Sequence, residues 1–425
     1  MAVHDWNPIP RGQLAPSGAE ASMPSHIKEF QATLRHFAVN VMRPIGQQLD
    51  KMTPEQVIAE DSPYWEFRKR YLDLGVRVET LMEMEPAEAA LLFSILFEEL
   101  GYGDSGLAIS VGAGILPQWL CAKFGRLDLL EEFPDETLGC WAITEPDHGS
   151  DMLDPNGTTR ARGADYGSRP NCIATIKDGE IVLNGQKSAW VSNGIIADVC
   201  ILYCAADTGT GANPEKGCAL VFPLDLPGIS RGKPLDKLGQ RALNQGEIFF
   251  DNVKIPEKYL LAGPEDYLRA VYCIHTEANA LMGATFAGLA QAATDLAHDY
   301  VHERKQGGVP IIQHQSVKSR LFHLFRKTEM ARALTRRVLA FNNDPETFEP
   351  SLCSAMFAKT TSTQVSFEVT SDALQLFGGN GLTREYPIEK MLRDARASLI
   401  EDGCNEILSI KGGSYLYDPE KAQGS

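Results

Sequence analysis

Two adjacent carboxylates, Glu401 and Asp402, stand directly before Gly403, at the end of a stretch in which charged and apolar residues are interspersed. The glycine indicates a turn. A carboxylate on a turn beside an apolar helix can be kept away from water, which suits it to act as a base. We therefore treat this pair as the candidate catalytic group. Neighbours on a turn more often point apart, so a solvated Glu401 is the simpler interpretation of the second carboxylate.

Two further segments combine a turn with side chains that could contact a flat or anionic ligand. Residues 142–151, AITEPDHGSD, run from an apolar stretch into a Gly/Ser turn that offers the hydroxyl groups of Thr144 and Ser150. Residues 184–194, NGQKSAWVSNG, place Trp190 among small polar residues, where an indole ring could stack on a cofactor. Taken alone, an ordinary polar turn explains the first segment equally well, and periodicity favours a core tryptophan in the second.

The C-terminal part contains two glycine-rich segments that could approach a phosphate or a ligand. Arg304 precedes Gly307 and Gly308, and an arginine at a helix end beside a glycine turn suits a phosphate, although an ordinary basic turn looks the same. The segment QLFGGNG, residues 375–381, allows close approach of its backbone. His298 and His302 are one helical turn apart, but no carboxylate or cysteine partner is identifiable, so no metal site is predicted.

The bulk composition limits the class of protein. The chain has 425 residues, too many for one core, with 44% hydrophobic and 23% charged residues, as in ordinary globular proteins. A net charge of −16 argues against a nucleic-acid partner. The nine cysteines are scattered without a CxxC pair, and neither a secretion signal nor a membrane-spanning run is expected. We therefore expect a cytoplasmic protein with reduced thiols and no membrane span.

The elements that must position these residues fall into an order of helices, then strands, then helices. We expect a mobile arm over residues 1–25, a helical domain over 26–137, an antiparallel β domain over 138–262 and a helical bundle over 263–425. Asp178-Gly179 separates two alternating runs and predicts a tight hairpin turn. The segment at residues 151–169 is expected to be a long loop. The absence of βαβ alternation argues against a Rossmann fold.

Four motifs in this order resemble the acyl-CoA dehydrogenase family: AITEPDHGSD, NGQK…WVSNG, KLGQRALNQGEIFFDNVKIP and QLFGGNGLTREYPIEKMLRDAR. The resemblance covers nearly the whole chain after the arm. It implies an α+β multi-domain fold with an N-terminal helical domain, a middle antiparallel β domain and a C-terminal four-helix bundle. It also implies FAD as cofactor, an acyl-CoA substrate, an electron-transfer flavoprotein or similar acceptor, and a homotetramer.

The resemblance also implies roles for individual residues. Thr144 is expected to bind the flavin ring, Ser150 to contact the flavin phosphate or the thioester, and Trp190 and Ser192 to flank the ring. Arg304 and Gln315 match residues that hold the FAD diphosphate and adenosine, which Gln375 and Gly379 complete from an adjacent subunit. The remaining expected cofactor contacts are Gly149, Cys404 and Glu406, and the expected substrate contacts are Ser150, Glu401, Gly403 and Asn279.

The family's usual base is the Glu of a Tyr-Glu-Gly-Thr turn. Without gaps from Gln375, this register places Asp402 on that Glu, Glu401 on the Tyr and Cys404 on the Thr. The resemblance therefore assigns removal of the α-proton to Asp402, with transfer of the β-hydride to flavin N5 and an enoyl-CoA product. Because Asp is one methylene shorter, and some relatives with Asp here act on cyclic acyl groups, we expect a cyclic or otherwise unusual acyl group.

Several alternatives stay open at this stage. The Asp-Gly-Cys-Asn turn at residues 402–405 also resembles nitroalkane oxidase, a related flavin oxidase, although Ser409 stands where that enzyme has an arginine. A member that catalyses elimination without net oxidation, or a non-catalytic flavin-binding subunit, would share the same motifs. The second base position known in some members falls on Ala278, with Glu277 one residue away, so Glu277 ranks below Asp402.

Overall fold

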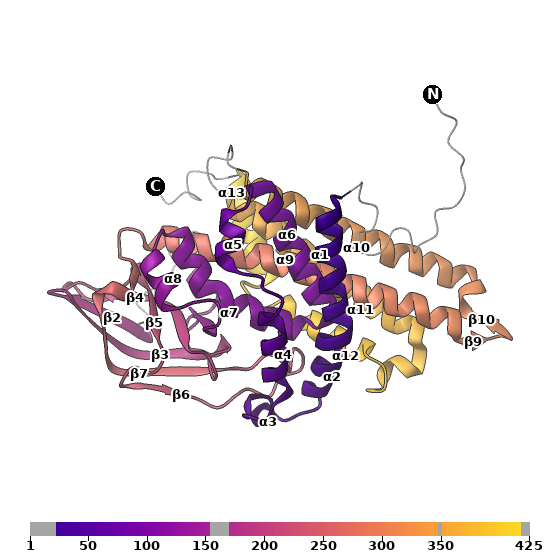
Figure 1. Cartoon of the computed structure of the whole chain (residues 1–425), viewed down its shortest axis with the longest axis horizontal. Helices are drawn as coiled ribbons and strands as arrows, with labels where there is room; N and C mark the ends of the chain where they lie inside the picture. Colours follow the sequence, from indigo (N-terminus) through magenta and orange to yellow (C-terminus); the bar gives the residue numbers. More distant parts are fainter. Residues whose placement is uncertain (1–22, 154–169, 345, 347–350, 418–425) are drawn as a thin grey trace.

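The structure is a computed structural model of the chain, and it describes residues 23–153, 170–344, 346 and 351–417. A β-sheet lies at one end, long helices extend to the other, and the N-terminal helices pack across the middle (Figure 1). This order confirms the predicted fold class. Most of the expected N-terminal arm and residues 154–169 of the expected loop lie outside the described residues. Met23 is buried, and Ser25 begins the first helix.

The N-terminal region is entirely helical in its described part. Proline stands at the first turn of four of its helices, where its missing N–H costs nothing. Asp104 caps a long helix by accepting the N–H of Leu107 at 2.9 Å. The elements are α1 Ser25–Phe37, a π-helical turn at Ala38–Met42, α2 Arg43–Leu49, α3 Pro54–Ile58, α4 Pro63–Leu72, α5 Val78–Glu83, α6 Pro86–Gly103, α7 Ser105–Lys123 and α8 Leu127–Glu132.

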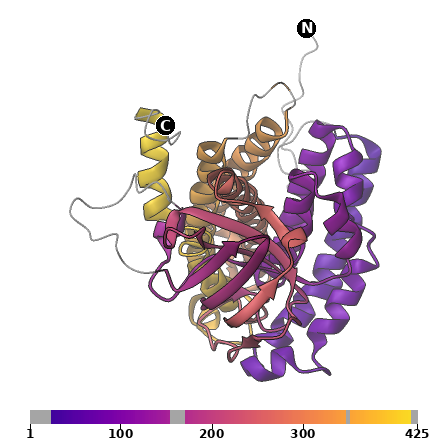
Figure 2. The same ribbon diagram turned by 90° about the vertical axis from the view of Figure 1, so that its left-hand side faces the viewer.

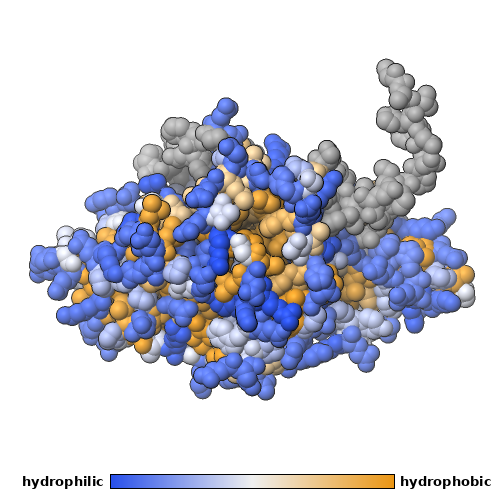
Figure 3. All heavy atoms as spheres, viewed as in Figure 1, coloured by the Kyte–Doolittle hydropathy of each residue, from blue (hydrophilic) through white to orange (hydrophobic). Residues whose placement is uncertain are grey.

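Helix α7 is long and apolar enough to cross a membrane by length and composition, although no such run was expected from the sequence. In the structure, 89% of its apolar window is buried inside the protein. It packs against α6, α9 and β1, so its apolar residues belong to the core. Figure 3 shows mostly hydrophilic residues at both ends of one face and hydrophobic residues gathered in its middle, where the N-terminal helices lie.

The middle region is one eight-stranded sheet in the order β6-β7-β3-β2-β4-β5-β8, with β1 also paired to β4. Figure 2 shows this sheet from the end of the molecule, in front of the long helices. Most ladders are antiparallel, but β1 and β2 both run parallel to β4. The sequence did not indicate these parallel ladders, because β4 returns beside β2 instead of beside β3. The strands are β1 Gly139–Ala142, β2 Cys172–Lys177, β3 Glu180–Ser192, β4 Val199–Asp207, β5 Asn213–Pro223, β6 Ile229–Arg231, β7 Gln245–Ile255 and β8 Leu260–Ala262.

The turn between β2 and β3 is the predicted one. Asp178 and Gly179 both have positive φ angles, 52° and 79°, and Lys177 pairs directly with Glu180. Two successive left-handed residues are the geometry of a tight hairpin turn. This local prediction is confirmed because its signal lies within four residues.

The C-terminal region is a helical bundle built around one long helix. Helix α9, Tyr267–Glu303, packs against α10, Gln315–Asn342, and α11, Leu352–Phe377, and also against α6. A short hairpin of β9, Lys305–Gln306, and β10, Val309–Pro310, joins α9 to α10 at the far end of the molecule (Figure 1). Helix α12, Ile388–Ser398, packs on α11 and α9, and α13, Asn405–Tyr417, packs on α11.

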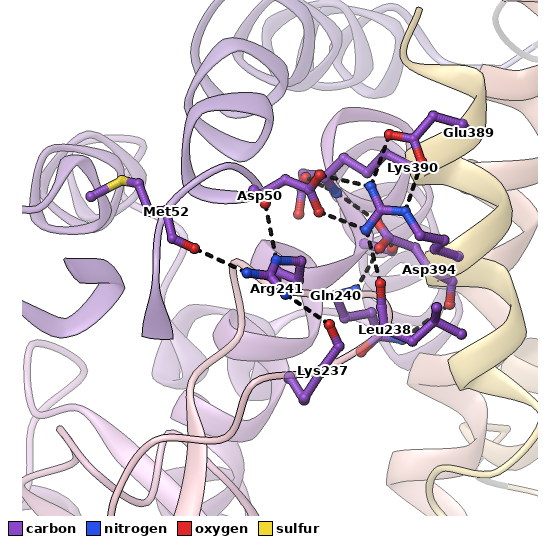
Figure 4. Close-up of polar contacts among 12 residues, drawn as sticks. Asp50, Met52, Lys237, Leu238, Gln240, Arg241, Glu389, Lys390 and Asp394 are labelled. Carbon is purple, nitrogen blue, oxygen red and sulfur yellow. Dashed lines mark hydrogen bonds and ion pairs between the residues drawn. The ribbon is translucent and has the colours of Figure 1, made fainter. Parts of the chain in front are cut away.

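A buried cluster of charges joins the three regions (Figure 4). Lys390 of α12 binds Asp104, at the start of α7, at 2.7 Å, and it also binds Asp394 one turn further along α12. Gln240, in the loop between β6 and β7, donates its backbone N–H to Asp394. Charges buried this deeply are tolerated only when they are paired, so the cluster fixes the position of α12 against both other regions.

A second ion pair supports the same joint. Arg393 of α12 binds both carboxylate oxygens of Asp50, at the end of α2, at 2.9 and 2.7 Å. Arg241 donates to the carbonyl oxygens of Asp50 and Met52. Gly239 lies so close to α12 that a Cβ there would be 2.3 Å from the Arg393 carbonyl oxygen. The loop at residues 237–243 therefore packs directly against α12.

We predict that Lys390→Met destabilises the protein by about 3–5 kcal/mol, because it leaves Asp104 and Asp394 buried without their cation. The measurement is the free energy of unfolding from denaturant titration. Lys258→Met is the matched control, since Lys258 pairs with Glu132 at the surface, and it should change stability very little. Equal effects of the two substitutions would contradict the structural role of the cluster.

Candidate active site

The predicted carboxylate pair lies on a tight turn between α12 and α13. Asp402 and Gly403 have φ angles of 51° and 86°, both in the left-handed region. A non-glycine residue is uncommon there and persists only when its surroundings hold it. A Cβ on Gly403 would also lie 2.8 Å from Cδ1 of Leu153. The turn is therefore a conformation that the rest of the fold imposes on these residues.

Side chains from two helices hold the backbone of this turn. Asn279 of α9 donates from Nδ2 to the carbonyl oxygen of Asp402 at 3.3 Å. Lys359 of α11 donates from Nζ to the carbonyl oxygen of Gly403 at 2.8 Å and to Oδ1 of Asn405 at 2.8 Å. Both of these side chains are fully buried, so they connect the turn to the interior of the helical bundle.

Asn279 was predicted to contact substrate, and the structure places it directly beside Asp402. Its Nδ2 donates to the carbonyl oxygens of both His275 and Asp402. These two acceptors define the orientation of the Asn279 side-chain amide, because its NH2 group can donate to carbonyl oxygens and its oxygen cannot. Its Oδ1 is buried and has no hydrogen-bond partner among the described residues.

Asp402 has the proton affinity of a base that works near neutral pH. The side chain is only half-buried, but the surrounding protein excludes enough water to raise the pKa of Asp402 to about 6. The Lys359 ammonium opposes this effect and keeps the pKa of Asp402 from rising further. A carboxyl with this pKa is ionised at neutral pH and still basic enough to accept a proton.

Glu401 behaves differently from its neighbour. Gln240 donates from Nε2 to Oε1 of Glu401 at 2.6 Å, which turns this carboxyl toward the β6–β7 loop. Burial, followed by the negative charge of Asp402, raises the pKa of Glu401 to about 8, although Lys237 and Lys359 oppose the shift. Glu401 is therefore largely protonated when Asp402 ionises, and it is not the solvated residue that the simpler interpretation predicted.

The structure brings the AITEPDHGSD loop to the carboxylate turn. Oγ of Ser150 lies 3.8 Å from Sγ of Cys404, although the two residues are 254 positions apart. Gly149 is exposed and donates its N–H to Asp151, and Glu406 is exposed in the first turn of α13. Two predicted contact residues, Ser150 and Cys404, thus meet beside Asp402.

A buried ion pair positions Thr144 at the end of β1. Lys187 and Glu145 pair at 2.6 Å with both side chains almost completely buried. Glu145 also accepts the backbone N–H of Asn171 at 2.6 Å, and Ser188 donates its N–H to the Thr144 carbonyl at 2.9 Å. The loop after β1 is therefore fixed on β3, the strand that carries Trp190.

Trp190 is 60% exposed on β3, so the interpretation as a core tryptophan, which periodicity favoured, is wrong. Gln245 donates from Nε2 to the carbonyl oxygen of Trp190 and to Oγ of Ser192, each at 3.2 Å. Gln245 is buried and holds this end of the strand. The indole ring is therefore available to a ligand that lies against the end of β3.

The residues predicted to hold FAD diphosphate lie at the opposite end of the bundle. Arg304 caps α9 and Gln315 begins α10, and both are exposed. Gln375 and Gly379 are also exposed at the end of α11, and a Cβ at Gly379 would meet no atom within 4 Å. Phe377 stacks on Tyr300 of α9 with ring centroids 3.9 Å apart, which brings the ends of α9 and α11 together.

The lower-ranked candidates have other partners. Glu277 forms an ion pair with Lys123 of α7 at 3.2 Å. His298 pairs with Asp299, and His302 bonds to the carbonyl oxygen of His298. Among the described residues, no group of three or more His, Cys, Asp or Glu side chains could hold a metal ion.

Sequence reasoning missed the two side chains that most directly control the turn, Lys359 and Gln240. Lys359 is the only charged residue between Ser351 and Phe367, and an isolated charge in an otherwise uncharged stretch of sequence was a usable signal. Gln240 stood inside a recognised motif, but nothing in the motif indicates that it reaches Glu401, 161 residues away.

Comparison with known proteins identifies the class of enzyme. Residues 140–253 match the acyl-CoA dehydrogenase middle domain, and residues 275–411 match the acyl-CoA dehydrogenase C-terminal domain. A probable acyl-CoA dehydrogenase of Bacillus subtilis strain 168 is 30% identical over 74% of this chain and 79% of its own length. The short-chain specific mitochondrial enzyme of Rattus norvegicus is 28% identical over 93% of this chain and 90% of its own.

The fold agrees with these sequence relationships. Butyryl-CoA dehydrogenase from Megasphaera elsdenii superimposes with a TM-score of 0.80 at 25% identity, covering 93% of this chain and 99% of that chain. The chain therefore belongs to the acyl-CoA dehydrogenase family, whose members are FAD-dependent oxidoreductases that act on CH–CH donors.

The described residues fit an FAD. The exposed indole of Trp190 offers an apolar face, and the loop after β1 presents Thr144 close to it in the sheet. At the other end of the bundle, the exposed Arg304 offers a cation, and Gly379 offers a backbone that a ligand can approach, because a Cβ there would meet no atom within 4 Å. The assignment of individual residues to parts of the cofactor remains a prediction.

We predict that Gly403→Ala destabilises the protein by about 1–3 kcal/mol, because it adds left-handed strain and a contact with Leu153. Unfolding free energy measures this effect. Gly413→Ala in α13 is the matched control, since a Cβ there meets nothing within 4 Å and should be neutral or stabilising by about 1 kcal/mol. A neutral Gly403→Ala would contradict the observed turn conformation.

Proposed function

We propose that this protein is an FAD-dependent acyl-CoA dehydrogenase in which Asp402 removes the α-proton of an acyl thioester and an enoyl-CoA is formed. The observation that carries this proposal is the carboxyl of Asp402, raised in pKa to about 6 on a turn that is fastened to two helices. Cys404, two residues after Asp402, lies 3.8 Å from Ser150, which belongs to the loop where the family contacts the flavin or the thioester.

In this step the protein must enable a carboxylate, which is a weak base, to remove the α-proton of the thioester. An α-proton is far too weakly acidic for a carboxylate unless the thioester carbonyl is polarised as charge develops on it. In the proposed mechanism, a backbone N–H of the turn next to Asp402 donates to that carbonyl. Exclusion of water then strengthens both this hydrogen bond and the basicity of Asp402. FAD, when bound, supplies the acceptor for the β-hydride.

The acyl group is proposed to be cyclic or otherwise unusual. Asp402 is shorter than the usual Glu, so the reacting carbon must come closer to the turn. A short-chain specific acyl-CoA dehydrogenase and a butyryl-CoA dehydrogenase are among its relatives, which favours a small acyl group. Glu401, held by Gln240, adds a largely protonated carboxyl next to the base, which suits a polar group on the acyl chain.

The remaining proposals rest on the family resemblance. We expect an electron-transfer flavoprotein or a similar acceptor to reoxidise the flavin, and a homotetramer in the cytoplasm to be the working form. In such a tetramer, Gln375 and Gly379 would complete the FAD site of an adjacent subunit. Light scattering of the holoprotein measures the subunit number, and a monomer that retains FAD would contradict the shared site.

The function is tested by anaerobic titration of the FAD-loaded protein with a panel of straight, branched and cyclic acyl-CoAs, following flavin absorbance. Bleaching by at least one of them is expected, with the corresponding enoyl-CoA as product. Oxygen consumption with nitroalkanes, and none with acyl-CoAs, would instead support a flavin oxidase. Absence of bleaching with every thioester, together with a stable complex with another chain, would indicate a non-catalytic subunit.

We predict that Asp402→Asn retains FAD but bleaches about 10²–10⁴-fold more slowly, because the only proposed base is removed. Stopped-flow absorbance measures the rate. Glu277→Gln is the control, since its partner is Lys123, and it should bleach at nearly the normal rate. Full bleaching by Asp402→Asn would overturn the assignment of the base.

We predict that the bleaching rate rises with pH through about 6 and then levels off, because Asp402 must be ionised to accept a proton. Glu401→Gln should leave this rise in place, since Glu401 is still protonated when Asp402 ionises. The rate is measured between pH 5 and 9 with a saturating acyl-CoA. A rise that disappears in Glu401→Gln would assign the titrating base to Glu401.

A further inference from the structure

We propose that Lys359 is a positioning residue of the proton-abstraction step, which holds the Asp402 turn from within α11 and supplies the cation that balances the carboxylate. This inference rests on the proposed function of Asp402. No sequence motif pointed to Lys359, and it does not contact the reacting atoms in the proposed mechanism. Its role follows from where its ammonium lies.

The ammonium of Lys359 occupies a site built for it. The side chain is 0% exposed, and its Nζ lies 2.8 Å from the Gly403 carbonyl and 2.8 Å from Oδ1 of Asn405. Oδ1 of Asn405 also accepts from Thr363 at 3.3 Å, and its Nδ2 lies 3.0 Å from Oγ1 of the same threonine. The three side chains therefore tie the residues that follow Asp402 to the middle of α11.

This attachment opposes the strain of the turn. Two consecutive left-handed residues are unfavourable in a free chain, and Asp402 carries a Cβ. The carbonyls of Asp402 and Gly403 are each held by a buried donor, Asn279 and Lys359 respectively. Removal of the lysine takes this donor away from the Gly403 carbonyl and from the side-chain oxygen of Asn405. The backbone of the turn is then held by Asn279 alone of these two donors.

The charge of Lys359 has a separate effect from its hydrogen bonds. The ionisable groups that act electrostatically on it are Asp402, Glu401, Cys404 and Glu406, and Lys359 is a buried cation among them. Lys237 is a second cation that acts on Glu401, and it bonds to the Leu243 carbonyl and to Gln245. Burial lowers the pKa of Lys359 to about 8, so it is still largely protonated at the pH where Asp402 ionises.

Two substitutions separate these effects. Lys359→Met removes both the charge and the donor, whereas Lys359→Gln removes the charge and keeps a donor. Without the cation, ionisation of Asp402 becomes harder, so its apparent pKa rises. Both variants should therefore shift the pH rise of anaerobic bleaching upward by about one pH unit or more. Hydrogen exchange of the peptide 399–408, followed by mass spectrometry, should become faster in the Met variant and change less in the Gln variant.

Lys411→Met is the matched control, because Lys411 is also a buried lysine of the bundle, bonded to the Leu153 carbonyl at 2.7 Å. It should leave the pH rise in place, although it removes a buried ammonium. A purely structural role of Lys359 predicts lower stability with an unchanged pH profile. Lys359→Met or Lys359→Gln holoprotein that bleaches with the wild-type pH profile would overturn the proposal.

The exchange measurement keeps the inference separate from the proposed function. If no acyl-CoA bleaches the wild-type flavin, the dehydrogenase proposal fails. Faster exchange of peptide 399–408 in Lys359→Met would still support the positioning of the turn, and unchanged exchange would overturn it.

Discussion

Pairing of buried charge is the constraint on which the rest of this structure depends. Lys390 can stay inside the protein only because Asp104 and Asp394 surround it, and these three groups come from the N-terminal helices and from α12. The β region joins the same cluster through the backbone of Gln240. The side chain of Gln240 then extends to Glu401, at the start of the turn that carries the two carboxylates. The packing of the three regions and the position of the carboxylates therefore depend on the same residues.

The turn itself shows how adjacent carboxyls can be given different properties. Gln240 holds Glu401 against the β region, whereas the backbone of Asp402 is held by Asn279 from the bundle. Burial raises the pKa of both carboxyls, and the negative charge of Asp402 raises that of Glu401 further, so the pKa values are about 6 for Asp402 and about 8 for Glu401. The lower pKa supports the proposal that Asp402 is the group that accepts a proton at neutral pH.

Local patterns predicted much of the fold, and distant contacts account for what they missed. The order of helices, strands and helices and the turn at Asp178-Gly179 were predictable because periodicity and turn-forming residues are properties of neighbouring positions. The parallel pairing of β2 with β4 was not, since it depends on where a later strand returns. Trp190 was misjudged because alternation along a strand does not tell which face a neighbouring domain covers.

The same division applies to the candidate site. Asp402, Ser150 and Cys404 followed from family motifs, and the structure brings Ser150 and Cys404 to within 3.8 Å. Lys359 belongs to none of the recognised motifs, and its proposed role depends on a hydrogen bond to the Gly403 carbonyl, 44 residues away along the chain. Contacts of this kind arise from tertiary packing, which a single sequence does not encode in any short pattern.

The central claim is that Asp402, and no other carboxylate, removes the α-proton. The most direct measurement is the uptake of deuterium at the α-carbon of an acyl-CoA incubated anaerobically with the FAD-loaded protein in D2O, followed by mass spectrometry of the recovered thioester. Our account predicts uptake with the wild-type and Glu277→Gln proteins and none with Asp402→Asn. Uptake that persists in Asp402→Asn and disappears in Glu277→Gln would contradict it.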